Sequence, residues 1–471
     1  MRTFRPTTAG LPCRALGLAA ALAIAPAACT DATTAAPSPA PAGASPVEPA
    51  DADAATDAAL AASPATTVFV APDGDDARDG RSRASAVRTI QRGVDLAGPG
   101  DVVGVAAGTY AEPDSTRNVA TLARAGTAAH WIRLRAEPGQ AVVIRSRNWQ
   151  GIGVQAPYVI VEGFHVVGAL GELLAGDPAR AARGALDDPV TDGNGIGVAG
   201  PSGSPGVPVH HVVVRGNVVE QVPGGGIYTY GADRVTVEDN VVRDCAYFSP
   251  YGNSGISLYQ NRASDRLGGV HMLVRRNRVS GCENRVPFYA AGQVTDGNGI
   301  IVDDSRNAQN GSAAGAYRWR TRVVNNVVWD NGGRGIHVYA SDHVDVVNNS
   351  TYHNSRHPDI REGELSAITA GDVRFVNNLA IAAPGRPAGT VYEGAGVQFV
   401  RNLLTGGPPP AGAASPANLL GVDPRLTDPA AARFTLRASS PARGAGTRWL
   451  APTLDADGRP RPAGPPNIGA Y

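Results

Sequence analysis

Apolar and polar residues alternate in a pattern that recurs along the second half of the chain. From about residue 208 a strand template of the form V-x-x-N-x-V repeats, and strict alternation as in Val235-x-Val237 is typical of strands buried on one face. The template asparagines are separated by 23, 37, 49, 23, 29 and 24 residues. The shortest interval predicts one turn of a coil, and the longer intervals predict the same turn with inserted loops. These asparagines are Asn217, Asn240, Asn277, Asn326, Asn349, Asn378 and Asn402.

A second template, a small residue followed by Ile, lies between the asparagines, so each turn contributes at least two short strands. The chain has 58 Gly and 37 Pro among 471 residues. That composition favours many short elements joined by turns and excludes a helical bundle. The second template occurs at Gly195-Ile196, Gly226-Ile227, Gly255-Ile256, Gly299-Ile300, Gly335-Ile336 and Ala367-Ile368.

Short strands, turns of nearly constant length and one asparagine in register per turn resemble the right-handed parallel β-helix of pectate-lyase-like proteins. The resemblance implies an all-β solenoid whose stacked asparagines form an internal hydrogen-bonded ladder, so we assign them a structural role. The coil repeats span residues 151–405. On this interpretation the aliphatic residues of the templates form the core.

The ends of the folded body, residues 67–150 and 406–471, resemble the opening and closing segments of bacterial β-helix proteins that include family 9 polysaccharide lyases. The resemblance implies a short helix at about residues 90–97 that caps the coil, and a C-terminal tail that closes it. The similar segments are 68–74, 89–91, 98–101 and 108–110 at the start and 434–436, 440–442 and 467–471 at the end.

The N-terminus is predicted to be a targeting segment. Arginines precede an apolar run over residues 15–28, which is shorter than the ~20 residues needed to span a bilayer, so residues 1–29 indicate a signal peptide and export. Residues 27–29 resemble a bacterial lipobox, which would make Cys29 a lipidated residue and a membrane anchor, although Pro26 stands where that motif prefers Leu. Ordinary cleavage after residue 27, which leaves a secreted protein, is the alternative.

Residues 30–66 are rich in Ala and Pro and lack basic and aromatic residues. Such a segment cannot bury enough apolar surface to offset its ordering entropy, so we predict a disordered linker. Further along, no apolar stretch is long enough to span a membrane. The body is therefore expected to be soluble and monomeric, attached to a membrane only through the N-terminal lipid.

The charge balance restricts the partners. With 42 Arg and no Lys against 42 Asp and Glu, the chain has no net field to attract nucleic acid, and it cannot form a Schiff base.

Cys245 and Cys282 each lie five residues after a ladder asparagine, which predicts that they occupy one column in adjacent turns about 4.8 Å apart. That separation suits a disulfide in an exported protein. Stacked free thiols are the alternative.

One outer face of the coil gathers aromatic and polar side chains. On the strands of the second template, the Ile and the residue two later point inward, so the positions between and after them point outward. This places Tyr230, Tyr259, Asp303 and Tyr339 in register. Tyrosine rings stack on sugar rings, so the face suits a polysaccharide. The candidate substrate-binding residues are Tyr228, Tyr230, Tyr259, Tyr339 and, from an inserted loop, Tyr251; the alternative is that they only pack against the coil.

The segment 295–304 carries three acids, Asp296, Asp303 and Asp304. Their carboxylates could bind Ca²⁺ through hard oxygen ligands, as in calcium-dependent β-helix lyases. Alternatively, Asp303 and Asp304 could divide the roles of acid and base, because like charges drive their pKa values apart. Asp296 could instead serve only the turn before the strand.

His337 and Arg334 lie beside Tyr339 and are candidate catalytic residues. The His337 imidazole could act as a general acid or base, and the Arg334 guanidinium could neutralise a uronate carboxylate or abstract a proton. An exported lyase that cleaves a uronate polymer by β-elimination is the leading hypothesis. A glycoside hydrolase with Asp303 and a second carboxylate, or a non-catalytic glycan-binding or envelope protein, are the alternatives.

The resemblance does not extend to any known subclass. Family 9 and family 6 lyases use a lysine base, which this chain lacks. The sequence also lacks the Gly-His-Gly and Arg-x-Lys motifs of β-helix polygalacturonases. It lacks the Tyr-Gly-Phe-Asp motif of alginate epimerases as well. The reaction must therefore be argued from the site itself.

Overall fold

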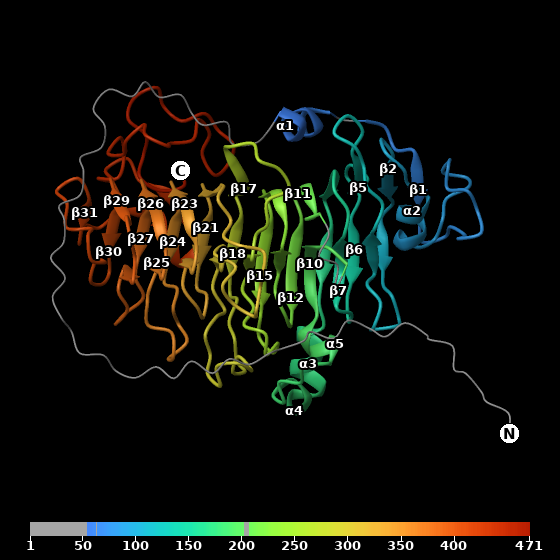
Figure 1. Ribbon diagram of the computed structural model, residues 1–471, viewed down its shortest axis with the longest axis horizontal. Helices are drawn as coiled ribbons and strands as arrows, with labels where there is room; N and C mark the ends of the chain where they lie inside the picture. The colour runs from blue at the N-terminus through green and yellow to red at the C-terminus, as the bar shows by residue number, and fades with distance from the viewer. Residues whose placement is uncertain (1–53, 63, 202–206) are drawn as a thin grey trace.

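The computed structural model describes residues 54–62, 64–201 and 207–471, so the predicted signal peptide, Cys29 and most of the predicted linker lie outside the described residues. Strands follow one another in a coil of stacked turns, three strands per complete turn, and strands of the same position in successive turns pair in parallel (Figure 1). The molecule is a parallel β-helix, as the sequence predicts, with a third strand per turn that the two templates do not reveal.

Three parallel sheets form the walls of the coil. Sheet A consists of β1 (Val68–Val70), β2 (Val102–Val105), β5 (Ile132–Ala136), β8 (Val159–Glu162), β11 (His210–Arg215), β14 (Asp233–Glu238), β17 (Val270–Arg275), β20 (Arg320–Val324), β23 (Asp342–Val347), β26 (Gly371–Val376) and β29 (Gln398–Val400). Sheet B consists of β3 (Gly108–Tyr110), β6 (Val142–Arg145), β9 (His165–Val167), β12 (Val218–Val222), β15 (Val241–Cys245), β18 (Arg278–Ser280), β21 (Val327–Trp329), β24 (Ser350–Tyr352), β27 (Leu379–Ile381), β30 (Leu403–Thr405) and β31 (Leu419–Leu420).

Sheet C carries the second template and the candidate site. It consists of β4 (Ala120–Leu122), β7 (Gln150–Val154), β10 (Asn194–Ala199), β13 (Ile227–Tyr230), β16 (Ile256–Tyr259), β19 (Ile300–Asp303), β22 (Ile336–Tyr339), β25 (Leu365–Ile368) and β28 (Gly389–Tyr392). The template isoleucines stack directly, because Ile256 pairs with Ile300 and Ile300 pairs with Ile336.

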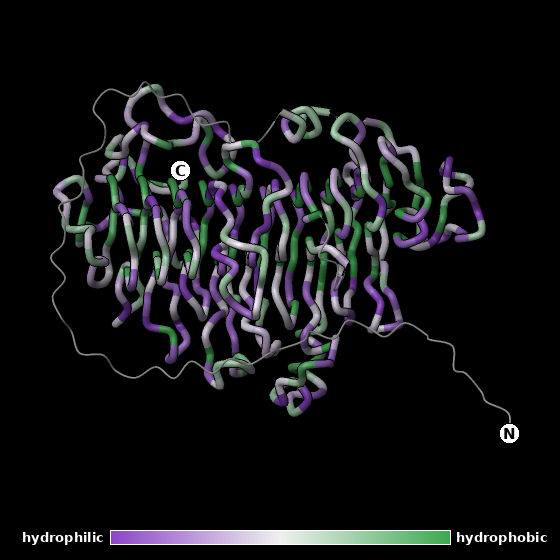
Figure 2. The backbone as a smooth tube through the Cα atoms, in the orientation of Figure 1, coloured by the Kyte–Doolittle hydropathy of each residue, from purple (hydrophilic) through white to green (hydrophobic). Residues whose placement is uncertain are grey.

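The core runs the length of the coil and is built from these stacked aliphatic side chains. Ile196, Ile227, Ile256 and Ile300 are completely buried in one cluster that also contains the inward valines of sheets A and B. Apolar segments accordingly alternate with polar ones along the strands (Figure 2). Because every turn buries its inner face only against its neighbours, the strand alternation of the sequence translates directly into core and surface.

The asparagine ladder is confirmed. The backbone N and Nδ2 of Asn240 donate to Oδ1 of Asn277 at 3.1 and 3.0 Å, and Asn277 repeats both bonds to Asn326 at 2.9 and 3.0 Å. The chain of bonds continues to Asn418. A second internal ladder, which the sequence analysis missed, runs from Asn331 through Asn354 to the carboxyl group of Glu364. Both ladders satisfy backbone groups that the coil buries at its bends.

A helix caps the first end of the coil, and the closing segment lies along its side. Helix α2 (Ile90–Leu96) forms at the predicted place, with the Thr89 hydroxyl accepting a bond from the backbone N of Arg92 as N-cap. After β31 the chain forms a hairpin of β32 (Leu426–Asp428) and β33 (Arg433–Leu436) around the 3₁₀ turn η1 (Pro429–Ala431). Its Phe434 packs with Val327 and Leu403, so the closing segment folds back along the outside of sheet B.

The prediction of disorder over residues 30–66 is wrong for its last part. Residues 54–61 form helix α1 (Ala54–Ala61), which packs Ala59 against Trp131 and Ile160 on the outer face of sheet A. Nη2 of Arg133 donates to the carbonyl oxygens of Ala59 and Ala62 at 2.8 and 3.1 Å. The apolar outer surface of sheet A therefore supplies the burial that the segment lacks by itself.

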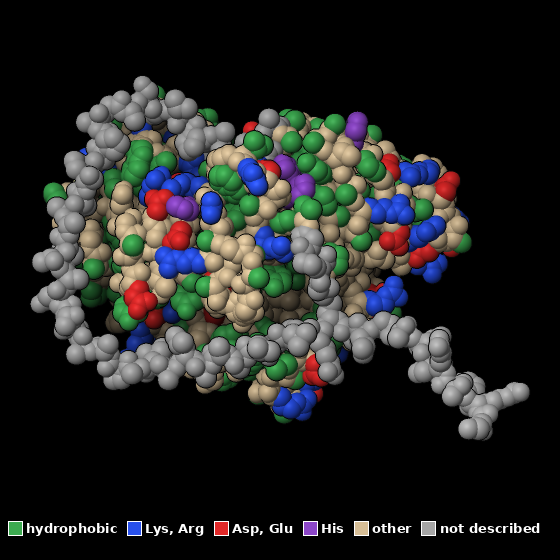
Figure 3. Space-filling view, viewed as in Figure 1, with side chains coloured by type: hydrophobic (Ala, Val, Ile, Leu, Met, Phe, Trp, Pro, Cys, Tyr) green, Lys and Arg blue, Asp and Glu red, His purple; other side chains and the backbone are tan. Residues whose placement is uncertain are grey.

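A helical insertion that the sequence analysis did not foresee projects between β9 and β10 (Figure 1). It contains α3 (Leu170–Gly176), α4 (Pro178–Ala181) and α5 (Pro189–Asp192). In the described part of the chain no helix has the length and apolar character needed to cross a membrane. On the face shown in Figure 3, acidic and basic side chains lie next to one another, as expected for a chain without net charge.

Candidate functional site

The predicted register of the outer face of sheet C is confirmed. Tyr230 pairs with Tyr259, Tyr259 with Asp303, and Asp303 with Tyr339, on the four consecutive strands β13, β16, β19 and β22. Ile300 and Val302 of β19 lie in the core, so the alternating Asp303 faces outward. The same row continues through Ile368 to Tyr392. We call this row the sheet C column: Tyr230, Tyr259, Asp303, Tyr339, Ile368 and Tyr392.

Aromatic rings are accessible along the column. Tyr230 and Tyr259 stack with 5.4 Å between ring centroids and 21° between planes. Tyr230 is 49% exposed and Tyr339 37% exposed. Burial, and then the charge of Asp303, raises the pKa of both Tyr259 and Tyr339, so both phenols stay protonated and can donate hydrogen bonds.

Asp303 lies in the middle of the column, where few hydrogen bonds stabilise the ionised form of its carboxyl group. Burial, then the charges of Asp296 and Asp304, raises the pKa of Asp303 well above its ordinary value. Its hydrogen bond is a long one, from Nε2 of Gln309 at 3.5 Å. A raised pKa favours the protonated form of the Asp303 carboxyl group, which is the form that a proton donor needs.

Asp296 lies at the edge of the column in a more polar environment. Its Oδ2 accepts a bond from Oγ1 of Thr295 at 2.7 Å and its Oδ1 accepts one from Nδ2 of Asn298 at 2.9 Å. Burial raises the pKa of Asp296 above its ordinary value, and these bonds and the charge of Arg334 offset only part of that rise. Asp296 and Asp303 thus form an electrostatically coupled acid pair in which Asp296 is the group more easily ionised.

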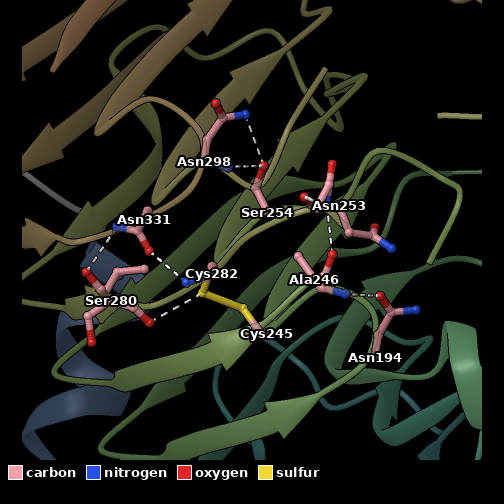
Figure 4. Close-up of a disulfide and its surroundings, with 12 residues drawn as sticks. Asn194, Cys245, Ala246, Asn253, Ser254, Ser280, Cys282, Asn298 and Asn331 are labelled. Atoms are coloured by element: carbon pink, nitrogen blue, oxygen red, sulfur yellow. Dashed lines mark hydrogen bonds between the residues drawn. A yellow bond between two sulfur atoms is a disulfide. The ribbon is translucent and has the colours of Figure 1, made fainter. Parts of the chain in front are cut away.

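The turn that carries Asp296 is held by the neighbouring rung. Backbone N and Nδ2 of Asn298 donate to Oγ of Ser254 at 3.2 and 3.0 Å, as Figure 4 shows. The predicted disulfide between Cys245 and Cys282 is confirmed, with a Cα–Cα distance of 4.5 Å. It joins the ends of β15 and β18, where the two inserted loops 246–255 and 283–299 begin (Figure 4). The disulfide therefore anchors the loop that bears Asp296.

Asp304 does not join the column, which corrects the prediction that it pairs with Asp303. The backbone takes a left-handed turn there, with φ of 46°, and the carboxylate is completely buried. It accepts bonds from Nε2 of Gln260 at 2.8 Å and from the backbone N of Ala308 and Gln309, each at 2.9 Å. Asp304 thus fixes the following loop instead of facing a substrate.

The three acids Asp296, Asp303 and Asp304 consequently do not form one metal-binding group. In the described residues no cluster of three or more His, Cys, Asp or Glu side chains is placed to hold a metal ion. The physical reason is that the Asp304 carboxylate is buried and already accepts three hydrogen bonds in the following loop. A calcium requirement remains a prediction for experiment.

Arg334 lies beside the acid pair but is not free to act as a base. Its Nη2 pairs with Oε2 of Glu362 at 2.9 Å, and its Nη1 donates to the carbonyl oxygen of Thr295 at 2.5 Å. Only 8% of the residue is exposed. Because the guanidinium is buried and held by both contacts, the structure gives Arg334 an electrostatic and positioning role next to Asp296.

His337 faces outward but is covered, which corrects the prediction of an exposed imidazole. It is 3% exposed, and its Nδ1 lies 2.8 Å from Oγ of Ser366 on the next strand. Burial, and then the charge of Arg334, keeps the pKa of His337 well below its ordinary value, so the ring is neutral. This location favours a packing role.

Tyr228 and Tyr251, the other two predicted substrate-binding residues, lie outside the sheet C column. Gln150 Nε2 donates to the Tyr228 hydroxyl at 2.5 Å, and the Tyr228 ring lies over Gly197, one row away from the column. Tyr251, in the inserted loop, donates to the carbonyl of Leu186 and packs edge-on against Tyr289. Tyr251 therefore ties the helical insertion to the loop wall and does not lie in the column.

Two residues of the site receive no site role from the sequence alone: Tyr392, and Glu362, whose cluster with Asp359 and Glu364 suggests only solvation of a loop. Tyr392 is 62% exposed and belongs to the column, but its strand begins Gly389-Thr390 and lacks the small-residue-Ile signal. Glu362, the partner of Arg334, stands in a loop and resembles any solvated acid in sequence. Only the strand register could have identified Tyr392, and nothing local could have identified Glu362.

Comparison with known proteins agrees with this architecture. A family model described as "Right handed beta helix region" matches residues 192–404. Among solved structures, pectate lyase Pel9A is similar over 88% of this chain and 98% of its own, with 16% identity and a TM-score of 0.52. A xylose complex of XylC aligns with 86% of this chain and 98% of its own (11% identity, TM-score 0.47). An alginate lyase from Paenibacillus sp. str. FPU-7 aligns with 71% of this chain and 96% of its own (16% identity, TM-score 0.39).

No curated protein matches the sequence. The family model and the likeness to Pel9A show that the chain has the right-handed parallel β-helix fold. At these identities the comparisons establish the fold alone.

Proposed function

We propose that this right-handed β-helix protein is a glycoside hydrolase that cleaves a polysaccharide at the acid pair Asp296 and Asp303. The observation that carries the proposal is the unequal environment of two coupled carboxyl groups on one exposed face. Asp303 has a raised pKa and few hydrogen bonds, whereas Asp296 is hydrogen-bonded by Thr295 and Asn298 and lies near the charge of Arg334. Two carboxyl groups whose environments divide them into acid and base are the requirement for glycoside hydrolysis.

In the proposed reaction Asp303 donates its proton to the glycosidic oxygen as the bond between that oxygen and the anomeric carbon breaks. Asp296, as carboxylate, serves the attack on the anomeric carbon. It acts either directly or by taking a proton from the attacking water. In direct attack, Asp303 recovers its proton from the water that then breaks the bond between the sugar and Asp296. In attack by water, Asp296 takes the proton of that water and loses it to solvent, and Asp303 is reprotonated from solvent. In both modes one sugar hydroxyl forms on each side of the broken bond. The anomeric configuration of the first product distinguishes the two modes of attack.

The tyrosines flanking Asp303 suit a sugar substrate. The stacked pair Tyr230 and Tyr259 lies on one side and Tyr339 on the other, each one strand spacing or two from the acid. Aromatic rings offer apolar faces to sugar rings, and their protonated hydroxyls offer donors to sugar oxygens. These contacts would orient a glycosidic bond over Asp303.

The leading sequence hypothesis, β-elimination by a lyase, finds less support in the geometry. Elimination needs a base to remove a carbon-bound proton. Arg334 is paired with Glu362, His337 is buried, and the phenols of Tyr259 and Tyr339 have raised pKa values. None of these groups is suited to accept a proton at neutral pH.

A product assay tests the proposal. The protein is incubated with neutral and uronate polysaccharides, and reducing ends and the ultraviolet absorbance of unsaturated products are measured, with and without a chelator. New reducing ends without unsaturation, lost in Asp303→Asn, support the hydrolase. Unsaturated products establish a lyase instead, and retention on a glycan column without any cleavage establishes a binding protein. Loss of activity with the chelator would support the predicted calcium requirement.

Export through the predicted signal peptide, with or without a lipid on Cys29, is part of the same proposal. The Cys245–Cys282 disulfide supports it, because such bonds persist in oxidising compartments. Metabolic labelling with a radioactive fatty acid, compared between the native chain and Cys29→Ser, distinguishes an anchored protein from a secreted one.

A further inference from the structure

We infer that the substrate is an uncharged glycan chain that lies along the sheet C column from Tyr230 to Tyr392 and is cut internally. The inference rests on the proposed function and adds to it the substrate class, the direction of the chain and a distal binding residue. Two independent observations carry it, the extent of the aromatic column and the charge of the surface around the acid pair.

The column is longer than the site that holds the acids. From Tyr230 to Tyr392 there are five strand spacings, through Tyr259, Asp303, Tyr339 and Ile368. At ~4.8 Å per spacing the row is about 24 Å long, enough for several sugar units. Its two end rings are the most exposed members, at 49% for Tyr230 and 62% for Tyr392.

Asp303 lies within this row and not at its end. Two tyrosines precede it and two follow it, so sugar units can be bound on both sides of the bond to be cleaved. A site that binds units on both sides of its catalytic acid along an open sheet cleaves inside a chain. The β28 strand that carries Tyr392 is the last strand of sheet C, which makes Tyr392 the terminal ring of the platform.

The charges beside the acid pair disfavour an anionic chain. The positive charge of Arg334 is compensated by Glu362 at 2.9 Å. Asp296 is an acidic group beside Arg334, and Glu393, adjacent to Tyr392 in sequence, is an exposed acid that accepts a bond from Thr369 at 3.0 Å. A uronate carboxylate on the column would therefore meet like charges, which costs binding free energy. Neutral sugar hydroxyls meet only hydrogen-bond donors and acceptors.

Glu362 is the residue that sets this preference. With its carboxylate in place, Arg334 offers no net charge to a substrate. Replacement of Glu362 by Gln removes one negative charge and leaves the guanidinium of Arg334 uncompensated beside the column. The same site should then tolerate a uronate better, although the acid pair is unchanged.

The charge test compares cleavage and binding of polymers of both classes by the native protein and by Glu362→Gln. The neutral polymers are xylan, β-glucan, galactan and methyl-esterified polygalacturonate, and the anionic polymers are alginate and the de-esterified polygalacturonate. We expect a preference of about tenfold or more for a neutral polymer, reduced in Glu362→Gln. Equal or better action of the native protein on an anionic polymer would overturn the inference and leave the hydrolase proposal intact.

Binding decides the inference even when nothing is cleaved. Dissociation constants for the same polymers are measured by calorimetry with Asp303→Asn, which retains the column. If no polymer is cleaved but the neutral ones are bound more tightly, the hydrolase proposal fails and the inferred ligand class holds. If the anionic polymers are bound as tightly as the neutral ones, the inferred class fails.

The position of the chain is tested at its far end. Tyr392→Ala should raise KM for the polymer about threefold to tenfold, because one stacking ring is lost. Leu267→Ala, which truncates a 68% exposed side chain on the loop before sheet A strand β17, is the matched control and should not change KM. Internal cleavage predicts that viscosity falls well before reducing ends accumulate. An unchanged KM in Tyr392→Ala, or release of single sugars from the start, contradicts the proposed path.

Discussion

The guanidinium of Arg334 lies 2.9 Å from the carboxylate of Glu362, which belongs to the loop before the next strand of sheet C. This pairing changes the interpretation of the outer face. Without it, Arg334 would be a cation without a counter-ion beside Asp296 and Tyr339, which suits a uronate. With it, the chemistry falls to the acid pair Asp296 and Asp303, and the following expectations can be checked.

The first prediction concerns the acid pair. Asp303→Asn should lower kcat/KM by at least about 100-fold, because the proton donor is lost, with the melting temperature nearly unchanged. Asp296→Asn should have a similar effect on kcat/KM. The control is Asp304→Asn, which should retain activity but lose about 1 to 3 kcal/mol of stability, since the buried Asp304 carboxylate accepts three bonds. If Asp304→Asn were inactive and Asp303→Asn active, Asp304 would be the catalytic acid and Asp303 the structural one.

A second prediction concerns stability and pH. Burial raises the pKa of Glu364 from 4.5 to about 8 and that of Asp192 from 3.8 to about 8. The folded protein then holds these protons more tightly than the unfolded chain. Their stabilising contribution is complete below about pH 4 and is lost as the pH rises through 8. Glu364→Gln does not titrate but offers one acceptor oxygen where the carboxyl group offers two to N and Nδ2 of Asn354. It should therefore melt below the native protein at pH 5, and this difference should shrink or reverse at pH 8.5. A pH-independent difference would contradict this.

His337→Ala should act on the fold and not on the chemistry. The substitution leaves a cavity and an unpaired Ser366 hydroxyl in a buried position, so we expect a loss of about 2 to 4 kcal/mol. The kcat of the remaining folded protein should stay within a few-fold of the native value. Denaturant unfolding and kcat at low temperature, measured on the same preparation, separate the two effects. A normal melting temperature with no turnover would return His337 to the catalytic group.

The asparagine ladder gives a fourth prediction. Asn326 receives bonds from Asn277 and donates to Asn349, all of them buried. Asn326→Leu should destabilise the protein by about 1 to 3 kcal/mol, because neighbouring backbone groups lose their partners inside the coil. Chemical denaturation measures the loss. An unchanged midpoint would mean that ordered water can replace the amide.

The disulfide should matter for activity as well as stability. The double variant Cys245→Ala, Cys282→Ala should lose about 2 to 4 kcal/mol, and the loop that carries Asp296 should become less well ordered. Activity should therefore fall at temperatures below the melting transition. Treatment of the native protein with a reductant should reproduce the effect, and the double variant should be insensitive to the reductant. If activity and melting fall together, the bond supports the coil and not the loop.

The periodic features of the fold could be predicted from the sequence with good precision. The seven template asparagines form the ladder, the template isoleucines stack in the core, and Cys245 and Cys282 form a bond. In each case the same residue type returns once per turn. Parallel stacking then converts a sequence interval into a spatial contact, whatever the length of the inserted loop.

The candidate site was predicted only in part, for a related reason. The register of Tyr230, Tyr259, Asp303 and Tyr339 follows from the strand period and was correct. The period does not say which outward side chains are covered, so His337 was wrongly expected to be exposed. Nor does it show that the chain turns at Asp304 and withdraws its carboxylate from the face.

The sequence by itself therefore determined the coil, the ladder and the row of outward tyrosines, because these depend on residues repeated at the pitch of one turn. Tertiary structure decided the charge and the exposure of the site. Three contacts depend on loop paths that the repeat period does not specify. They are the pairing of Arg334 with Glu362, the packing of the closing segment along sheet B and the packing of α1 on sheet A. These contacts fix which groups are protonated, paired or accessible, and so they decide the chemistry of the outer face.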